Sequence, residues 1–450
     1  MTRLDDVTPG AQNEVDDRTD NRFLEPDVEL MSRREIEKNQ EHAVVELVHY
    51  AWEHSPFYRE FWGSAGVSPG DITSVHDFST RIPLLAKDDI RAYRDRTGDP
   101  FGGLLCVDRS ELTSIVTSSG TTGEPELMAE RWDRIPPIPT ACLRDQWEWG
   151  LRPGDRVIIP TGTFKNYWDT LYSAMGLVPI YMDAWMGNGE RLLQAIKRHR
   201  VAFVQLVMPQ ILEIESLEAR YDIRDMLSSL KYISFAGQPM GAVLRRKVTE
   251  EWGVNIATYT SAGDCGLAWE GTDRDGYTLW EDTIYPEIVD PDTQREVGDR
   301  EIGELVATDI DNRVAPYIRF RSGDLVRRTK QTSALGRNHS RMWVVGRMGD
   351  ETMIDGKAVV VGDVWRIVET LPETSDGMFQ IIRYAPSMDR LRLRAGYAPE
   401  RTGDLGELAH RLISLLESEL GVGVDLDLMT TDEILTFSSS VAKFPRVVKK

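Results

Sequence analysis

The stretch TSSGTTGEPELM, residues 117–128, concentrates serine, threonine and glycine as a phosphate-binding loop does. Small hydroxyl and glycine residues let backbone N–H groups converge on phosphate oxygens, and the hydroxyls add further donors. The same stretch carries Glu124 and Glu126, where a loop that holds phosphates is expected to carry a base. An isolated match of this kind is equally compatible with a solvated surface loop. The neighbouring segments decide between the two interpretations.

The composition is that of a globular protein with a strong acidic excess. The chain has 450 residues, of which 41% are hydrophobic and 28% charged, and its formal charge is -20. This length predicts two or three domains. The negative charge argues against nucleic acid or an anionic membrane surface as a main partner. It leaves nucleotides open, because small anions are bound by local geometry rather than by net charge.

Other sequence features favour the cytoplasm. The three cysteines, Cys106, Cys142 and Cys265, are scattered and odd in number. This usage indicates a reducing compartment without disulfides, and no pair has the spacing of a structural zinc site. No apolar run approaches the roughly 18 residues of a membrane span. Residues 1–25 are acidic and polar, unlike a targeting peptide, and we expect them to form a disordered tail.

Helical periodicity begins near residue 41. Apolar side chains recur there at the spacing of one helix face, at Val44, Leu47, Val48, Ala51 and Trp52. Proline and glycine in residues 55–72 break this pattern, and a second helical segment is predicted at residues 84–95.

Beyond the Ser/Thr/Gly loop, short apolar runs alternate with helical patterns. The runs predict strands at residues 155–160, 201–208, 231–237 and 255–261. Helices are predicted between them at residues 189–200 and 241–253, and residues 277–328 are rich in strand patterns. Such alternation predicts an α/β fold, with a large N-terminal domain of mixed β-sheets covered by helices.

A domain boundary is predicted near residue 345. Beyond it the patterns predict a helix, two strands, a helix and a strand, at residues 361–371, 378–385, 390–398, 405–420 and 424–430. This order predicts a small α+β domain. We therefore expect a tail over residues 1–25, a large domain over residues 26–345 and a small domain over residues 346–450.

Three further motifs carry candidate binding residues. RFRSGDLV, residues 319–326, places Asp324 after a glycine turn, where its carboxylate can accept hydrogen bonds from two ribose hydroxyls or cap the next segment. FAGQPM, residues 235–240, offers an exposed backbone edge for a flat base, and Tyr259 is available to stack on that base. TSAGDCG contains Asp264, a candidate Mg²⁺ ligand. Each motif is unspecific alone, but their order along the chain is informative.

That order resembles the adenylate-forming superfamily and, within it, the phenylacetate–CoA ligase branch, over nearly the whole chain. The segment HSPFYREFWGSAGVSPGDITSVHDF…IPLLAKDDIR is similar to the N-terminal signature of that branch, which is more specific than the phosphate loop. TSSGTTGEP resembles the pyrophosphate loop, AGQP the adenine-flanking turn, RFRSGD the ribose motif, and GR at Gly346 and Arg347 the start of the interdomain hinge. VAKFPRVVKK resembles the closing segment, with Lys443 as the catalytic lysine and Arg446 as its neighbour.

The resemblance implies a two-step reaction that uses ATP and Mg²⁺. A carboxylic acid attacks the α-phosphorus of ATP, and pyrophosphate leaves. The small, mobile C-terminal domain then rotates, and a second nucleophile, usually the thiol of CoA, displaces AMP. The ammonium of Lys443 would bridge the carboxylate and the α-phosphate, although a basic solvated tail is the alternative interpretation. The resemblance also favours a homodimer.

The same resemblance implies two sets of nucleotide-binding residues. The phosphates would be bound by Ser118, Ser119, Gly120, Thr121, Thr122 and Gly123. Adenine and ribose would be bound by Ala236, Gly237, Gln238, Tyr259, Asp324 and Arg347.

The loop departs from the family pattern, in which a lysine is common at or near Glu124 or Glu126. A lost charged contact is worth roughly 1.5–3 kcal/mol, and a carboxylate adds repulsion unless Mg²⁺ screens it. Backbone N–H groups and the loop hydroxyls remain. We expect weakened but real ATP binding; alternatively, the loop swings away and both glutamates face solvent.

Other departures concern the metal, the hinge and the lysine loop. The acidic residue of the magnesium motif usually lies four positions after the tyrosine, where this chain has Gly263, with Asp264 one later. Gly349 stands where an aspartate is common in the hinge, and Ala442 replaces the usual glycine before Lys443. Together these differences suggest a specialised member whose second step can differ from CoA transfer.

The acid pocket is predicted along PTGTFKNYWDTLYSAMG, residues 160–176. Candidate lining residues are Phe164, Lys165, Tyr167, Trp168 and Tyr172, which could form a flat aromatic slot. Aromatic residues at helical spacing are equally compatible with an ordinary core. A cation at Lys165 could meet an additional acidic or hydroxyl group on the substrate.

The functional prediction is an ATP-dependent aryl acid–CoA ligase acting on a small-molecule acid. Alternative acceptors of the acyl-adenylate are a carrier-protein thiol or an amine, and a more distant alternative is adenylation of nitrite for diazotisation of an aryl amine. The rival from another class is a non-catalytic nucleotide-binding relative. Asp324 and Lys443 argue against that rival, because a degenerate binder has no need of the lysine.

Overall fold

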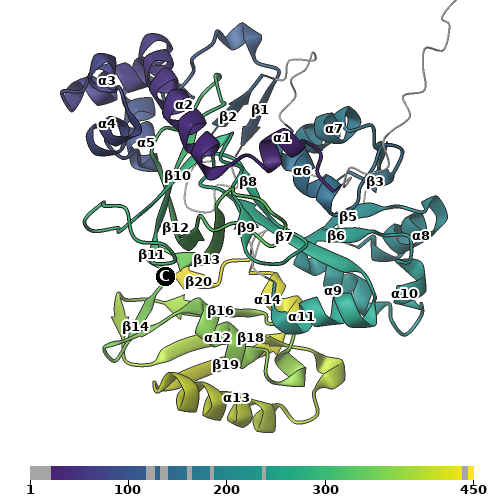
Figure 1. The fold of residues 1–450 in the computed structure, drawn as a ribbon. Helices are drawn as coiled ribbons and strands as arrows, with labels where there is room; N and C mark the ends of the chain where they lie inside the picture. The colour runs from purple at the N-terminus through teal and green to yellow at the C-terminus, as the bar shows by residue number, and fades with distance from the viewer. Residues whose placement is uncertain are drawn as a thin grey trace, which may run out of the picture.

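The computed structural model describes residues 22–117, 127–131, 140–159, 165–182, 187–235, 240–437 and 444–450. The described residues between 22 and 347, here called the body, form the upper part of the molecule in Figure 1. The residues from 352 onward, here called the C-terminal unit, form a smaller layer below it. None of the helices in the described ranges is long and apolar enough to cross a membrane.

One 11-stranded mixed sheet runs through the described part of the body, in the order β10-β11-β12-β13-β9-β8-β7-β6-β5-β3-β4. Its strands are β3 (Arg156–Ile158), β4 (Val178–Ile180), β5 (Phe203–Leu206), β6 (Tyr232–Phe235), β7 (Asn255–Ser261), β8 (Leu267–Glu270), β9 (Tyr277–Thr278), β10 (Ile284–Val289), β11 (Ile302–Asp309), β12 (Phe320–Thr329) and β13 (Arg341–Arg347). Strands β3 to β7 pair in parallel, and the pairs from β7 to β10 are antiparallel. The turn after β7 therefore lies at the carboxyl end of the parallel half, where ligands bind in open α/β sheets.

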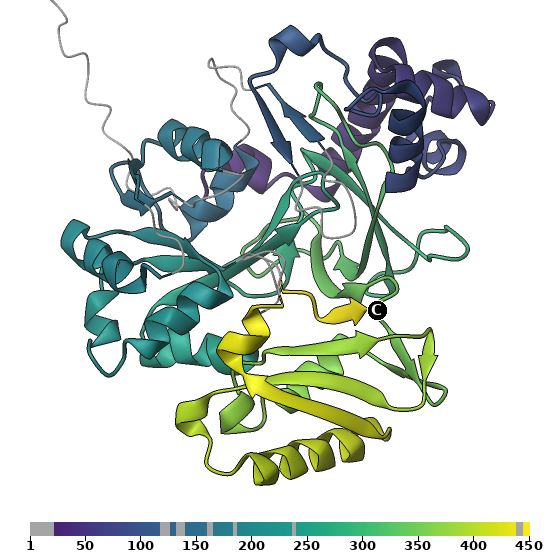
Figure 2. The same cartoon turned by 180° about the vertical axis from the view of Figure 1, so that it is seen from behind.

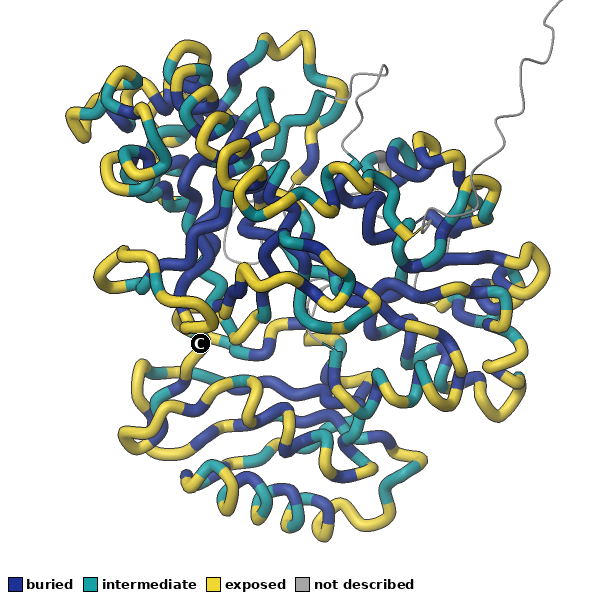
Figure 3. The backbone as a smooth tube through the Cα atoms, viewed as in Figure 1, coloured by how far each residue is buried: buried dark blue, intermediate teal, exposed yellow. Residues whose placement is uncertain are grey.

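Helices separate the parallel strands, as the alternation in the sequence predicts. They are α6 (Ala141–Glu148), α7 (Lys165–Ala174), α8 (Gly189–His199), α9 (Met208–Ser216), α10 (Ile223–Met226) and α11 (Ala242–Arg246), which continues into the π-helical turn η3 (Lys247–Glu251). Strand β6 is buried at every residue, as expected for a central parallel strand with helices packed against the sheet. Figure 3 shows the buried residues concentrated along the strands of the body. Among the described residues the predicted strands and helices of this region are confirmed, except that β5 ends at Leu206 and Met208 already begins α9.

The N-terminal helices pack against the antiparallel end of the sheet (Figure 1). They are α2 (Arg33–His54), α3 (Pro56–Ser64), α4 (Val75–Arg81) and α5 (Lys87–Thr97), with the 3-10 turn η1 (Pro69–Asp71); α1 (Pro26–Glu29) precedes them and the 3-10 turn η2 (Arg109–Glu111) follows them. One expectation was wrong here, and one helix was not predicted. Helix α2 begins before residue 41, because Ser32 accepts a hydrogen bond from the backbone N–H of Glu35 and caps it. Helix α2 ends at His54, which agrees with the predicted break, but the proline at residue 56 then occupies the first position of α3, a helix that was not predicted, since that position needs no N–H partner.

A short antiparallel hairpin flanks the Ser/Thr/Gly loop. Strand β1 (Ser114–Thr117) pairs with β2 (Leu127–Glu130), and Thr117 lies opposite Leu127. The hairpin register fixes where the two ends of the loop begin. Residues 118–126 between these ends lie outside the described residues.

The C-terminal unit contains two small sheets. A three-stranded sheet has the order β15-β14-β17 and a four-stranded sheet the order β19-β18-β16-β20. The strands are β14 (Thr352–Ile354), β15 (Lys357–Val359), β16 (Phe379–Arg383), β17 (Ser387–Met388), β18 (Leu391–Tyr397), β19 (Val424–Thr430) and β20 (Val447–Lys449). The helices are α12 (Val361–Val368), α13 (Leu405–Leu420) and α14 (Thr431–Leu435), with 3-10 turns η4 (Pro372–Thr374) and η5 (Pro399–Arg401). The predicted order of helix, two strands, helix and strand is confirmed as α12, β16, β18, α13 and β19. Figure 2 shows α14 and β20, in yellow, on the side of this unit that faces the body.

Candidate active site

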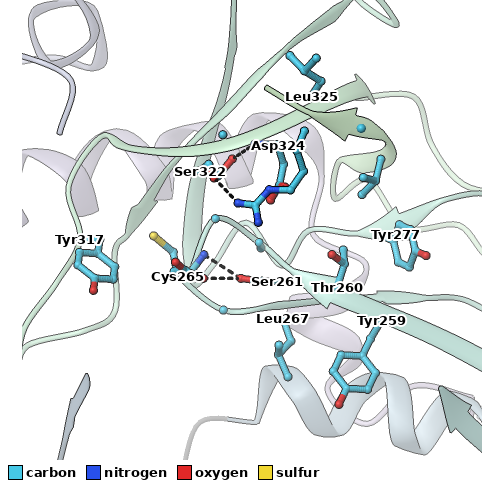
Figure 4. Close-up of a pocket in the computed structure, with 18 of the residues that line it drawn as sticks. Tyr259, Thr260, Ser261, Cys265, Leu267, Tyr277, Tyr317, Ser322, Asp324 and Leu325 are labelled. Carbon is cyan, nitrogen blue, oxygen red and sulfur yellow. Dashed lines mark hydrogen bonds and ion pairs between the residues drawn. The ribbon is translucent and has the colours of Figure 1, made fainter. Parts of the chain in front are cut away.

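A cleft of about 2720 Å³ lies between the body and the C-terminal unit. Its walls combine the β7–β8 turn, the segment after β11, the start of β12, the end of β13, helix α12 and strand β20. Figure 4 shows part of the wall formed by the body. Pockets for single small ligands usually measure ~300–1,000 Å³, so this cleft has room for more than one substrate.

Asp324 lies on this wall, at the position that the ribose motif predicts. The β12–β13 register places it opposite Arg347, and its Oδ1 atom lies 3.0 Å from Nε of Arg347. The Asp324 backbone N–H donates to Oγ of Ser322, and Arg347 Nη2 donates to the Ser322 carbonyl oxygen (Figure 4). Gly323 has a φ of +74°, a left-handed conformation that favours glycine and turns the strand before the carboxylate. The structure thus brings two predicted nucleotide-binding residues together in the cleft.

Asp264 lies in the β7–β8 turn and is held by two neighbours. Its backbone N–H donates to Oγ of Ser261 at 2.8 Å, and its Oδ2 atom lies 3.0 Å from Nζ of Lys87. Lys87, which the sequence analysis did not single out, begins helix α5 and lines the same cleft. Gly263 leaves no room for a side chain, because a Cβ there would lie 2.7 Å from Cβ of Ala307. The acidic residue of this turn is therefore at position 264.

The described residues offer limited protein ligation for a metal. They contain no cluster of three or more histidine, cysteine, aspartate or glutamate side chains that could hold an ion. Mg²⁺ that is bound mainly by substrate phosphates needs only one or two protein carboxylates. The Asp264 carboxylate fits that requirement, with Lys87 as its present partner.

Tyr259 lies at the end of the parallel half with one face already covered. Its ring stacks on Trp269, with the centroids 4.3 Å apart, and Trp168 meets it edge to face. Burial raises the pKa of the Tyr259 phenol well above its usual range, and Gln205 hydrogen-bonds it. Figure 4 shows the ring pointing away from Asp324. If adenine stacks on Tyr259 as expected, it can therefore use only the face of the ring that Trp269 leaves uncovered.

The predicted acid-pocket residues divide into two groups. Tyr167 and Trp168 line the cleft, and the Tyr167 hydroxyl lies 2.9 Å from Sγ of Cys142. Tyr172 is instead fully buried in the core of the body, and the exposed Lys165 lies with its Nζ 5.4 Å from the ring of Tyr181. The positions of Tyr172 and Lys165 give no support to their expected role on the cleft wall. Phe164 lies outside the described residues.

An acidic pair on the cleft wall was missed by the sequence analysis. Asp309 ends β11, and Asp311 follows it, with its side chain exposed to the cleft. Asn312 Nδ2 donates to Oδ2 of Asp309 at 2.7 Å. Burial and repulsion from Asp311 raise the pKa of the Asp309 carboxyl. Two aspartates two positions apart, directly after a buried strand, are the pattern that could have revealed this pair.

Arg446, the expected neighbour of the catalytic lysine, is enclosed by aromatic rings of the C-terminal unit. Its guanidinium carbon lies 3.8 Å from the ring centroid of Trp365 and 4.8 Å from that of Phe379. Nη1 donates to the Gly377 carbonyl oxygen at 2.6 Å, and burial lowers the pKa of Arg446 to about 9. This enclosure fixes the chain three residues after Lys443, which itself lies outside the described residues.

Several other predicted residues fall in segments that the structure does not describe. They are Glu124 and Glu126, the phosphate-loop residues Ser118, Ser119, Gly120, Thr121, Thr122 and Gly123, and the adenine-turn residues Ala236, Gly237 and Gln238. Their roles stay predictions.

The curated relatives reported below carry the same name, phenylacetate–coenzyme A ligase. No family model matches the chain. The sequence is 27% identical over 415 residues to a phenylacetate–coenzyme A ligase from Thermus thermophilus, which covers 88% of this chain and 91% of the relative. A phenylacetate–coenzyme A ligase from Aromatoleum evansii is also 27% identical, over 95% of this chain and 97% of the relative.

Solved structures match over a similar extent. A crystal structure of 2-hydroxyisobutyryl-CoA ligase in the postadenylation state has a TM-score of 0.82 at 24% identity, and the match covers 98% of this chain and 95% of that chain. The thioesterification state of the same ligase has a TM-score of 0.65 at 26% identity, over 95% of this chain and 92% of that chain. The chain has the fold of this adenylate-forming CoA ligase. The chain is a homologue of phenylacetate–coenzyme A ligases at 27% identity over most of its length, so the resemblance seen in the sequence is confirmed.

Proposed function

We propose that the protein activates a carboxylic acid with ATP and transfers the acyl group to CoA. A carboxylate oxygen attacks the α-phosphorus of ATP, the bond to the pyrophosphate oxygen breaks, and the products are acyl-adenylate and pyrophosphate. The thiol of CoA then attacks the acyl carbon, its proton is released, and AMP leaves. The observation that carries the proposal is the Asp324–Arg347 pair on the wall of a cleft large enough for several substrates, in a homologue of CoA ligases.

The chain's own residues would supply binding and orientation. The Asp324 carboxylate can accept hydrogen bonds from both ribose hydroxyls, and Lys443 would stabilise charge as it builds on the α-phosphate. Mg²⁺ would be held by Asp264 together with the phosphates and would neutralise phosphate charge. Tyr167 and Trp168 give the acid an aromatic wall, which favours an aromatic acid such as the phenylacetate named for the relatives.

The test is pyrophosphate release from ATP and Mg²⁺ across a panel of acids, with and without CoA. The panel contains phenylacetate, benzoate, hydroxy- and aminobenzoates, 2-hydroxyisobutyrate and nitrite. Release that depends on one organic acid and rises with CoA is the expected result. Silence with every acid in the presence of ATP would overturn the proposal and favour the non-catalytic relative, and release with nitrite alone would favour diazotisation.

Finer proposals concern the acceptor, the compartment, the oligomeric state and the domain division. The acceptor would be CoA, with a carrier-protein thiol or an amine as alternatives. The same assay separates CoA from these alternatives, because added CoA would leave the rate of pyrophosphate release unchanged if the acceptor were a carrier protein or an amine. The protein would act in the cytoplasm. It would be a homodimer there, and light scattering coupled to gel filtration can test this oligomeric state. We also propose the division into a large domain over residues 26–345 and a small domain over residues 346–450, which limited proteolysis near residue 345 can test.

A further inference from the structure

The C-terminal unit contacts the body through a carboxylate at the end of helix α12. Glu369 follows this helix, and its Oε2 atom accepts a hydrogen bond of 3.2 Å from the backbone N–H of Ala242, the first residue of α11. Its Oε1 atom accepts from the indole Nε1 of Trp365 in the same unit. Burial raises the pKa of the Glu369 carboxyl, whereas the hydrogen bond from Trp365 acts in the opposite direction. One side chain of the C-terminal unit thus rests on one amide of the body.

The Glu369 carboxylate lies directly against the backbone of Gly241, and this contact is here called the Glu369–Gly241 seat. A Cβ at position 241 would overlap Oε1 of Glu369 and would lie 2.6 Å from its Cδ and 2.8 Å from Nε1 of Trp365. The backbone does not require glycine there, because φ is -68° and ψ is 154°, values that any residue adopts. The contact with the C-terminal unit is therefore the feature that excludes a side chain at this position.

A second contact joins the two parts through an ion pair. Arg401 of the turn η5 pairs with Glu215 of helix α9, and Arg401 Nη1 also lies 3.0 Å from Oδ1 of Asp376 within its own unit. Lys247 approaches the same Glu215 carboxylate to 2.5 Å. Because Glu215 is only 11% exposed, solvent screens this pair less than it would a surface pair.

The arrangement of body and C-terminal unit also agrees with one state of a solved neighbour. The chain matches 2-hydroxyisobutyryl-CoA ligase with a TM-score of 0.82 in the postadenylation state. The open and thioesterification states of the same ligase give 0.67 and 0.65. The two contacts described above belong to the arrangement that gives the higher score.

We infer that the Glu369–Gly241 seat and the Arg401–Glu215 pair hold the C-terminal unit in the position used for adenylation. This inference rests on the proposed two-step function. Glu369, Gly241, Arg401 and Glu215 are positioning residues, since none of them needs to touch the reacting atoms. Contacts made in only one arrangement stabilise that arrangement and must be broken before the second step.

The main variant is Gly241→Ala, which places a methyl group in the seat and leaves the backbone conformation available. Hydrogen exchange of the ligand-free protein reports the contact directly, because the Ala242 amide is bonded to Glu369. We expect the peptide over residues 240–246 to exchange faster in this variant than in the wild type. This readout does not depend on activity, so it stands even where the proposed function fails.

Activity is measured separately for the two half-reactions. With the acid that the pyrophosphate panel identifies, adenylation is followed as exchange of labelled pyrophosphate into ATP. The second step is followed as thioester formation from synthetic acyl-adenylate and CoA. We expect Gly241→Ala to slow adenylation by about tenfold or more and to change the second step by less than about threefold.

Matched variants keep the inference falsifiable if Gly241→Ala folds poorly. Gly403→Ala is the control, because no atom lies within 4 Å of a Cβ there and φ is ordinary. Glu215→Gln should show the same preference for adenylation loss, since Lys247 keeps Glu218 and Arg401 keeps Asp376 as partners. Adding Glu369→Ala to Gly241→Ala should recover part of the lost adenylation, because the overlapping carboxylate is gone. Equal loss in both half-reactions, or unchanged exchange at residues 240–246, would overturn the inference.

Discussion

The Asp324 carboxylate lies 3.0 Å from Nε of Arg347, and 22% of its side chain is exposed. If the Asp324 carboxylate accepts hydrogen bonds from the ribose hydroxyls, Asp324→Asn should raise the Kd of ATP by about tenfold to a hundredfold, because a hydrogen bond to a charged group contributes ~1.5–3 kcal/mol. Calorimetric titration with ATP and Mg²⁺ measures this directly. Asp299→Asn, at an exposed position, is the control. An unchanged Kd in Asp324→Asn would remove this residue from the nucleotide site.

Asp145 of helix α6 is a second residue with a defined prediction. Its side chain is fully buried, and Trp280 Nε1 donates to its Oδ2 atom at 2.9 Å. The nearby Arg337 already pairs with Glu29 and Glu148, so a third carboxylate is not needed to balance the guanidinium. Burial raises the pKa of Asp145 to about 8.

This shift makes stability depend on pH with a defined sign. The unfolded chain releases the Asp145 proton near pH ~4, whereas the folded chain keeps it until about pH 8. The folded state binds more protons between these values, so the contribution to stability is complete below pH ~4 and is lost as the pH rises to about 8. Relative to Asp145→Asn, the wild type should lose ~1–3 kcal/mol of unfolding free energy between pH 6 and pH 8. Urea unfolding of both proteins at the two pH values checks this, and parallel losses would contradict it.

The β7–β8 turn carries a prediction about a whole element. Gly263 has a φ of +65°, and an added Cβ would lie 2.7 Å from Cβ of Ala307. Gly263→Ala should therefore destabilise the protein both through backbone strain and through the contact with β11. Gly154→Ala isolates the strain alone, because Gly154 has a φ of +87° and no atom lies within 4 Å of its added Cβ. In urea unfolding, Gly263→Ala should lose ~1–3 kcal/mol more unfolding free energy than Gly154→Ala. Equal losses of unfolding free energy would show that β11 shifts to accommodate the added methyl group.

At the same scale, sequence periodicity predicted the elements with strong apolar patterns. Strand β7 and helix α13 have the predicted bounds, because β7 buries Ile256 and Ala257 and α13 buries leucines at the spacing of one helix face. Helix α3 was missed, since its proline was interpreted as a break although it occupies the first helical position. The contact between Lys87 and Asp264 depends on long-range packing that no local pattern encodes. Asp324 was predicted only because its motif is local.

For the whole molecule, the feature that the sequence could not predict is the position of the C-terminal unit relative to the body. The patterns predicted an α/β body and an α+β unit, and both folds are present. They could not predict that Glu369 would rest on Ala242, because that contact joins residues 127 positions apart. A position defined by such contacts is set by the assembled molecule, which is why Gly241 has no visible signal in the local sequence.

The overall charge of the molecule leads to a last prediction. The protein carries a formal charge of -20, and CoA is also an anion, so their long-range interaction is repulsive. The Debye length falls from about 30 Å at 0.01 M salt to about 8 Å at 0.15 M salt. The kcat/KM for CoA should therefore rise by roughly two- to fivefold over this range, the reverse of attractive steering. Pantetheine, a thiol without phosphates, is the matched control and should change little. If kcat/KM for CoA falls with salt instead, the basic side chains of the cleft wall, such as Arg366 and Lys449, outweigh the net charge along the path of entry.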